Sequence, residues 1–256
     1  MFELKIVQNT IIKLQPIDSS KLTDNEKQPI NAVATFKLQS YALVDNHIKF
    51  AMIEQQFQGH NTWFAYLPHV QLLNDGQPIP LVLVTQAQLS AIAPNANADR
   101  LAQLITPLNN TLQRYNIATS LRKAHFLAQT AHESDGFNTN EEYASGSDYE
   151  GREDLGNVQP GDGVKFKGRG LIQITGRTNY DACGKALGVD LIDNPSRLAD
   201  FDLAALSAGW FWDKNGLNNY ADQDDILTIT KIINGGTNGL DDRQAYLDRA
   251  KQVFGI

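Results

Sequence analysis

Residues 120–137 read SLRKAHFLAQTAHESDGF and carry the clearest helical pattern of the chain. Thr119 or Ser120 can cap the start of this helix, and Gly136 is placed to end it. The apolar stripe expected on one face consists of Leu121, Ala124, Leu127, Ala128 and Ala131. Glu133 then falls in the last turn, where the negative end of the helix dipole disfavours a carboxylate and should keep the group protonated. Glu133 is therefore a candidate general acid, although a solvent-exposed glutamate would fit the same position.

A second carboxyl group follows nine residues later, after a polar segment that we expect to leave the helix. Glu141 and Glu142 are adjacent there, and this pattern does not choose between them. Two carboxylates on different elements can face each other across a cleft, and hydrolysis of a glycosidic bond uses such a pair. A separation of roughly 6.5 to 9.5 Å would leave room for an attacking water. A merely solvated acidic loop is the alternative.

A glycine-rich run, KFKGRGLIQITGRTNY at residues 165–180, contains a short apolar alternation. The pattern predicts a strand on which Gln173 and Thr175 share one face, so that an amide and a hydroxyl can hold a water or an acetamido group. A structural hairpin is the alternative. A nucleotide-binding loop is excluded because the spacing of glycines, lysine and hydroxyl that cradles phosphates does not occur.

Composition removes several other classes of function. A formal net charge of -7 argues against binding to duplex nucleic acid, which usually requires a basic surface. Cys183 is the only cysteine, so no internal disulfide and no cysteine-rich zinc site can form. His125 and His132 do not have the spacing of a zinc-binding helix. No apolar run is long enough to cross a membrane, so we expect no membrane insertion.

Periodicity divides the 256 residues into two parts, and we place the boundary near Thr85. Residues 1–84 contain alternating runs at 34–38, 47–53 and 63–66, separated by turn-forming residues such as those at 45–46, and contain no arginine. They predict a small antiparallel β domain. Residues 85–256 predict a mostly α domain, with helices over 86–92, 98–115, 120–134, 178–187, 202–213, 224–233 and 241–253. The fold class expected is α+β.

Other features remain open on local patterns alone. Asn234 and two glycines end an apolar helix, which requires nothing more than a helix stop. Arg243, one turn into the next helix, could pair with a buried carboxylate or with substrate. Trp210 and Trp212 could stack on sugars, but packing in the core is the commoner role.

Three motifs in this order, at residues 124–134, 168–175 and 233–236, resemble glycoside hydrolase family 19, the chitinase-like lysozymes. The resemblance covers residues 86 to 256 and implies a lysozyme-like, α-rich fold that inverts the anomeric carbon without a cofactor or metal. Residues 140–146 and 149–152 resemble phage endolysins and related bacterial wall hydrolases. The likeness of residues 1–84 to a small SH3-like module is weaker, and it suggests wall binding through Trp63, Phe64 and Tyr66.

The resemblance also assigns roles to single residues. Glu133 matches the general acid, Glu142 the base, and Thr175 a hydroxyl that helps to hold the attacking water. Positions that line the substrate cleft or support its charge network are matched by Gln173, Asn179, Asn234 and Arg243. Thr178 stands where plant chitinases have tyrosine, and their disulfide cysteines are missing here.

We therefore expect an endolysin-type hydrolase that cuts peptidoglycan between N-acetylmuramic acid and N-acetylglucosamine. A chitinase acting on chitin oligomers and a non-catalytic wall-binding protein are the alternatives. Residues 1–30 show no secretion signal, so we expect synthesis in the cytoplasm and release to the wall, for example through a holin-type pore. A monomer is the oligomeric state expected.

Overall fold

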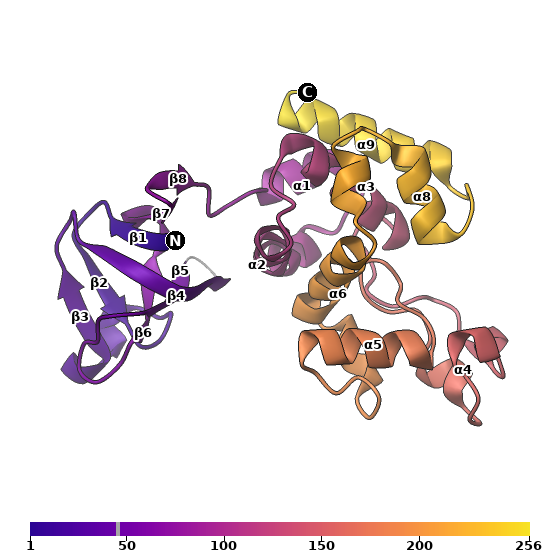
Figure 1. Ribbon diagram of the computed structural model, residues 1–256, viewed down its shortest axis with the longest axis horizontal. Helices are drawn as coiled ribbons and strands as arrows, with labels where there is room; N and C mark the ends of the chain where they lie inside the picture. The colour runs from indigo at the N-terminus through magenta and orange to yellow at the C-terminus, as the bar shows by residue number, and fades with distance from the viewer. Residues whose placement is uncertain (45–46) are drawn as a thin grey trace. The chain divides into compact units, whose positions relative to one another are not determined.

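The computed structural model describes residues 1–44 and 47–256, so the turn expected at Asp45 and Asn46 lies outside the described residues. The chain divides into two compact units, Met1–Leu83 and Val84–Ile256. Figure 1 shows strands in the indigo-to-purple unit and helices in the magenta-to-yellow unit. The model is thus α+β. Within the described residues, no helix is both long and apolar enough to span a membrane.

In the first unit, here called the β domain, the described residues form an antiparallel sheet of eight strands in the order β3-β2-β6-β5-β4-β1-β7-β8. The strands are β1 Phe2–Ile6, β2 Thr10–Lys13, β3 Lys27–Ile30, β4 Thr35–Val44, β5 His47–Met52, β6 Thr62–Tyr66, β7 Val70–Asn74 and β8 Gln77–Ile79. Alternation puts one face of each strand inward. Trp63 and Ala65 of β6 are fully buried, whereas Tyr66 is exposed. Trp63 is therefore a core residue, and it cannot make the wall contact suggested for it.

The second unit contains the helices α1 Gln86–Ile92, α2 Ala98–Arg114, α3 Ser120–Glu133, α4 Asp162–Lys165, α5 Arg177–Leu187, α6 Phe201–Lys214, α7 Leu217–Ala221, α8 Ile226–Asn234 and α9 Leu240–Phe254. Helix α3 lies at the centre of its packing, alongside α9 (Figure 1). Every residue from Ala124 to Ala131 is buried. Trp212 is also fully buried, and its ring meets Phe126 of α3 edge to face.

The glycine-rich run does not form the strand that we expected. Arg169 makes isolated β-bridges to Glu141 and Ile174, and the residues between Arg169 and Ile174 form a turn. Gln173 has a φ of 55°, a left-handed conformation that is uncommon for a residue other than glycine. The alternation of apolar and polar residues suggested a strand, but the chain reverses too soon for one. Residues 168–175 are therefore a tight hairpin.

Candidate active site

Glu133 is the last residue of α3, and a buried arginine holds its carboxylate. Thr119 caps the start of the helix by accepting a hydrogen bond from the N–H of Arg122. Arg243, in the first turn of α9, forms an ion pair with Glu133 and donates a hydrogen bond of 2.5 Å to Oε1 of Gln129. Arg243 is fully buried, whereas the Glu133 side chain is 17% exposed. The carboxylate is thus fixed from behind and reachable from solvent.

Glu142 is held by neutral donors instead of a charge. The N–H of Gly168 donates to Oε1 at 2.9 Å, and the hydroxyl of Tyr149 donates to Oε2 at 3.0 Å. The backbone of Glu142 also pairs with Gly168, since its N–H donates to the Gly168 carbonyl at 3.0 Å. Burial raises the pKa of Tyr149, and its hydrogen bond to Glu142 adds to that effect. The hydroxyl therefore stays a donor to this carboxylate at neutral pH.

Glu141 points to a different set of partners. Its carboxylate lies 2.9 Å from Nε of Arg169 and 3.2 Å from Nζ of Lys167. Burial opposes ionisation of this group, but the hydrogen bonds and charges of Lys167 and Arg169 outweigh that and lower the pKa of Glu141. Two cations already occupy this carboxylate. Glu142, in contrast, has no ion pair among the described residues.

Three predicted site residues converge on Gly168. A Cβ atom added at Gly168 would lie 2.8 Å from Oε1 of Gln173, 3.3 Å from Oγ1 of Thr175 and 3.4 Å from Cδ of Glu142. The missing side chain of the glycine therefore allows these groups to approach one another. Oε1 of Gln173 is buried and has no hydrogen-bond partner among the described residues. An unsatisfied acceptor beside a carboxylate and a hydroxyl is a place where water or an amide N–H can bind.

The segment between the two glutamates is firmly anchored. Phe137 is fully buried, and Nε of Arg100 donates to its carbonyl oxygen at 3.0 Å. A second nitrogen of Arg100 donates to the side chain of Asn140 at 2.9 Å, and the Asn140 carbonyl accepts from the N–H of Gly170 at 2.8 Å. The connection thus binds both to α2 and to the hairpin. The positions of Glu133 and Glu142 are fixed relative to each other by these contacts.

The remaining predicted residues have different surroundings. Asn179, in the first turn of α5, donates to the carbonyl of Thr175 at 2.8 Å and so supports the hairpin. Asn234 is the exposed last residue of α8, and among the described residues no hydrogen bond or ion pair joins it to Glu133 or Glu142. Arg243 had two possible partners, and the structure shows pairing with a carboxylate. Its complete burial makes it a support for Glu133 and not a surface that sugars touch.

Sequence reasoning did not single out Tyr149, Gly168 or Gln129 as functional groups, although each holds a member of the site. Gln129 lies one turn before Glu133 on α3, so helical spacing places it where the partner of Glu133 can also reach it. Tyr149 gives no such signal. Its contact with Glu142 depends on the path of a loop.

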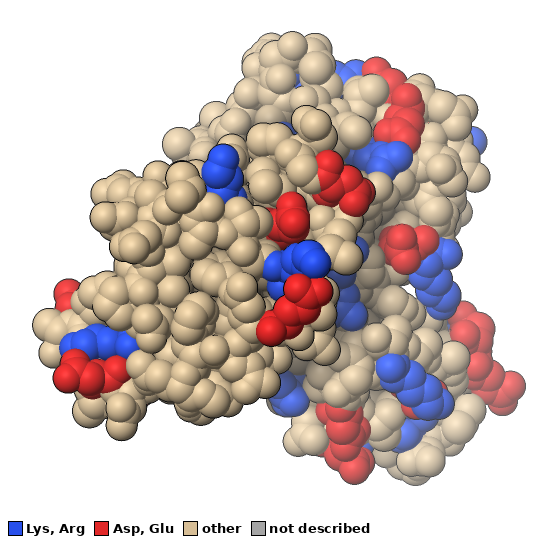
Figure 2. Space-filling model, turned by 60° about the vertical axis from the view of Figure 1, so that its left-hand side comes forward, with Lys and Arg blue, Asp and Glu red and all other residues tan. Residues whose placement is uncertain are grey.

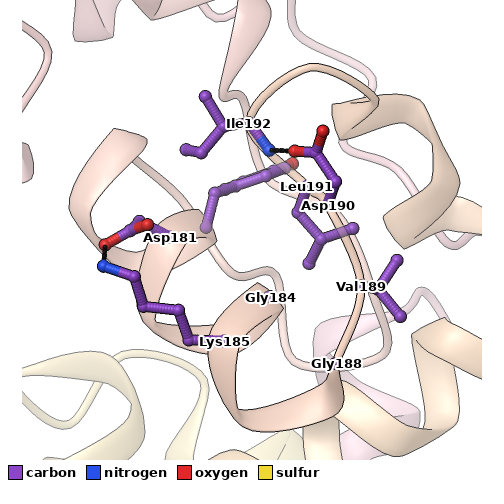
Figure 3. A pocket seen from close by; sticks show the side chains of 9 residues that line it. Asp181, Gly184, Lys185, Gly188, Val189, Asp190, Leu191 and Ile192 are labelled. Carbon is purple, nitrogen blue, oxygen red and sulfur yellow. Dashed lines mark hydrogen bonds and ion pairs between the residues drawn. The ribbon is translucent and has the colours of Figure 1, made fainter.

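Two surface features lie outside this site. A hollow of about 300 Å³ lies at the end of α5, and Figure 3 shows that its charged side chains satisfy one another or the local backbone. Lys185 pairs with Asp181, and Asp190 accepts from the N–H of Ile192. Figure 2 shows acidic and basic side chains interspersed on the face in view, with no broad basic area there. That face offers no track for a phosphate backbone.

Similar proteins identify the family of the chain. The family model described as chitinase class I matches residues 112–228. A glycosyl hydrolase family 19 domain-containing protein of Haemophilus influenzae is 30% identical over 194 residues, which are 63% of this chain and 92% of that protein. The chain belongs to glycoside hydrolase family 19. It is accordingly a glycosidase.

Other family 19 relatives extend the comparison. The acidic 27 kDa endochitinase of Solanum lycopersicum is 37% identical over 138 residues, which are 44% of this chain and 52% of that protein. The chain thus spans about half the length of that plant relative. Chitinase C from Streptomyces griseus has a TM-score of 0.57 at 20% identity, with 86% of this chain and 92% of that chain covered. That structural likeness shows a family 19 chitinase-like fold.

Proposed function

We propose that the chain hydrolyses the β-1,4 bonds of an N-acetylhexosamine polymer, with Glu133 as general acid and Glu142 as general base. The observation that carries the proposal is the pair of carboxyl groups on separate, mutually anchored elements, one held by Arg243 and one by Tyr149 and Gly168. Glu133 protonates the bridging oxygen while Glu142 removes a proton from water that attacks the opposite face of the sugar. Such a reaction inverts the anomeric carbon.

Thr175 and Gln173 orient the attacking water in this mechanism. The hydroxyl of Thr175 donates a hydrogen bond to the carbonyl oxygen of Gln173 at 3.0 Å, so the lone pairs of the hydroxyl oxygen remain able to accept a hydrogen bond from water. The unsatisfied Oε1 of Gln173 supplies a second acceptor beside Glu142. Because water has two O–H bonds, it can donate one hydrogen bond to the Glu142 carboxylate and the other to one of these acceptors. The two hydrogen bonds fix its orientation. Holding water in one orientation is a large part of what a general base needs.

We further propose that the polymer is peptidoglycan and that the bond cut joins N-acetylmuramic acid to N-acetylglucosamine. Support comes from the endolysin-like motifs at residues 140–146 and 149–152 and from the bacterial relative, of which the chain covers 92%. The β domain, whose likeness to SH3-like modules is weak, would then attach the enzyme to the wall.

Chitin is the second candidate substrate, because several relatives carry the name endochitinase. This sequence lacks the disulfide cysteines of plant chitinases and has Thr178 where they have tyrosine. Both differences weigh against a long chitin-binding cleft. A family 19 protein that binds wall without cutting it would retain binding in Glu133→Gln and show no turnover in either form.

The test uses bacteria with permeabilised outer membranes and follows the loss of turbidity. Wild type should clear the suspension and release fragments with new reducing ends, whereas Glu133→Gln and Glu142→Gln should each be slower by about 10²- to 10⁴-fold, since each lacks one proton-transfer group. Mass spectrometry of the fragments identifies the bond. If chitin oligomers are cut and walls are not, the substrate is chitin. If neither is cut, both catalytic assignments fail.

We also propose delivery to the wall after synthesis in the cytoplasm, through a pore that a partner provides. The expected result is that the protein, produced alone in a bacterial host, lyses cells only when a holin-type pore is produced with it. Recovery of the protein from the periplasm in the absence of the partner would contradict this.

A further inference from the structure

The β domain contains a hollow of about 530 Å³, lined by apolar and polar side chains and separate from the two glutamates. Its walls come from β2, the segment after β2, and residues of β5, β6 and the turn that follows β6. Six of the lining residues bear on its chemistry: Thr10, Lys13, Asp18, His47, Tyr66 and His69. All of them belong to Met1–Leu83.

Lys13 is the unusual residue of this hollow. Its side chain is only 7% exposed, and its ammonium donates to the carbonyl of Ile17 at 2.6 Å and lies 2.8 Å from Nε2 of His47. In the described part of the chain, no carboxylate comes within ion-pair distance of this ammonium. A buried cation without a counter-ion is costly, and burial lowers the pKa of Lys13 despite the opposing charge of Asp18.

The other polar groups leave space for an incoming anion. Asp18 is turned toward Ser20, whose N–H and hydroxyl both donate to its Oδ1 at 2.8 Å, so it acts on Lys13 only at a distance. His69 is bonded to Thr10 at 2.9 Å, and the partly exposed ring of Tyr66 lies edge-on to His69. An ammonium has three N–H donors, and the contacts to Ile17 and His47 account for two. No partner for the third is found among residues 1–44 and 47–256, so it can bind a ligand.

We infer that this hollow binds a carboxylate group of a wall peptide and that Lys13 forms the ion pair with it. The exposed apolar side chains of Ile11 and Ile17 at its edge would contact the short aliphatic side chains of such a peptide. The identity of the ligand rests on the proposed function, because peptidoglycan carries peptides with carboxylates and chitin is a neutral polymer. Recognition of the peptide would then direct the enzyme to peptidoglycan through a domain that takes no part in catalysis.

The experiment is isothermal titration of the full chain with N-acetyl-D-alanyl-D-alanine, a probe with one carboxylate, and with its C-terminal amide. We expect the acid to bind and the amide to bind at least tenfold more weakly. Lys13→Met should lose at least tenfold in affinity for the acid, whereas Lys21→Met, which removes an exposed lysine of the same segment, should bind as wild type does. Asp18→Asn should bind more tightly, because it removes a nearby negative charge and keeps a side chain that can cap Ser20.

Folding is checked with the same variants. Lys13→Met should melt at the same temperature as wild type or higher, since it replaces a buried cation by an apolar side chain of similar length. Equal affinity for acid and amide, or unchanged affinity in Lys13→Met, would overturn the inference. The inference would also be overturned if Lys13→Met melted at a lower temperature than wild type and Asp18→Asn left the affinity for the acid unchanged. Lys13 would then be a structural hydrogen-bond donor.

The catalytic variant separates this inference from the proposed function. Glu133→Gln should bind the dipeptide as tightly as wild type, and Lys13→Met should hydrolyse soluble glycan oligomers at the wild-type rate. Dipeptide binding by a wild-type protein that cuts no wall would leave the inference standing and refute the proposed function. Wall cleavage without dipeptide binding would refute the inference and leave the proposed function standing.

Discussion

The two glutamates of the site are held by different chemistry. A buried guanidinium contacts Glu133, whereas Glu142 accepts hydrogen bonds from a hydroxyl and a backbone N–H. The sequence places Glu133 at the negative end of the dipole of its helix. The structure adds Arg243, which orients the carboxyl group from inside the protein. Catalysis by a positioned acid depends on that orientation.

Replacement of Arg243 by lysine tests this support. Lysine keeps the charge but cannot contact Glu133 and Gln129 at once, since it lacks the two-pronged geometry of arginine. We expect kcat on soluble oligomers to fall by about 100-fold, the scale of a misplaced catalytic group, with little change in KM. A raised KM with unchanged kcat would instead make Arg243 a contact for substrate.

Glu141→Gln and Glu142→Gln form a matched pair of adjacent substitutions. Glu142→Gln should remove most of the activity and leave the fold intact. Glu141→Gln should retain activity and destabilise the fold by less than about 1 kcal/mol, because the Glu141 side chain is 41% exposed and solvent screens its ion pairs. Thermal melts and turbidity assays of both variants provide the comparison. Loss of activity in Glu141→Gln alone would reverse the assignment of the base.

At the scale of elements, a charge network links buried His125 of α3 to the exposed segment before α8 and to α9. His125 of α3 is completely buried, with Nε2 2.8 Å from Oδ1 of Asp224, while Lys251 of α9 binds the other oxygen of Asp224 at 2.5 Å. Burial lowers the pKa of His125 below 6.5, although hydrogen bonding to Asp224 and the charges of Asp224 and Asp225 oppose this. The native helices therefore resist protonation of His125.

This network predicts how stability depends on pH. Well above pH 6.5 His125 is neutral in both states and has no effect; as the pH falls through 6.5, the unfolded chain takes up a proton that the folded chain does not. Stability should therefore fall by up to about 1.4 kcal/mol per pH unit until the lowered native pKa is reached. Denaturant unfolding at pH 7.5 and 5.5 measures this. In His125→Asn the loss of stability between pH 7.5 and 5.5 should be smaller than in wild type. An equal loss would mean that other groups cause the pH dependence.

The sequence predicted helices better than strands, for physical reasons. Helix α3 was expected at residues 120–134 and extends from Ser120 to Glu133, because its period, cap and terminal glycine all lie close together in the chain. β1, β2, β3, β7 and β8 were not among the runs singled out, because each is only three to five residues long and shows too little alternation by itself. At residues 168–175 the pattern favoured a strand with a hairpin as the alternative, and the structure has the hairpin. The convergence of Gln173, Thr175 and Glu142 on Gly168 needed three-dimensional coordinates.

At the scale of the whole molecule, the proposed function assigns catalysis to the helical unit and attachment to the β domain. The helical unit has its own core around α3, and Asn109 of α2 binds both the N–H and the carbonyl of Val84 at its start. We expect a fragment of residues 82–256 to fold and to hydrolyse soluble oligomers at the wild-type rate, while its binding to intact walls weakens. Circular dichroism, oligomer assays and wall sedimentation measure these properties. Equal sedimentation of fragment and full chain would remove wall binding from the β domain.

The measurement that tests the central claim most directly is proton NMR of the first sugar ends released by wild-type protein from soluble glycan strands, with chitin hexamers in parallel. Water activated by Glu142 on the face opposite the leaving group must give the α-anomer first, followed by slow mutarotation to the equilibrium mixture. Initial release of the β-anomer would mean retention through a covalent intermediate. That result would contradict the roles assigned to Glu133 and Glu142.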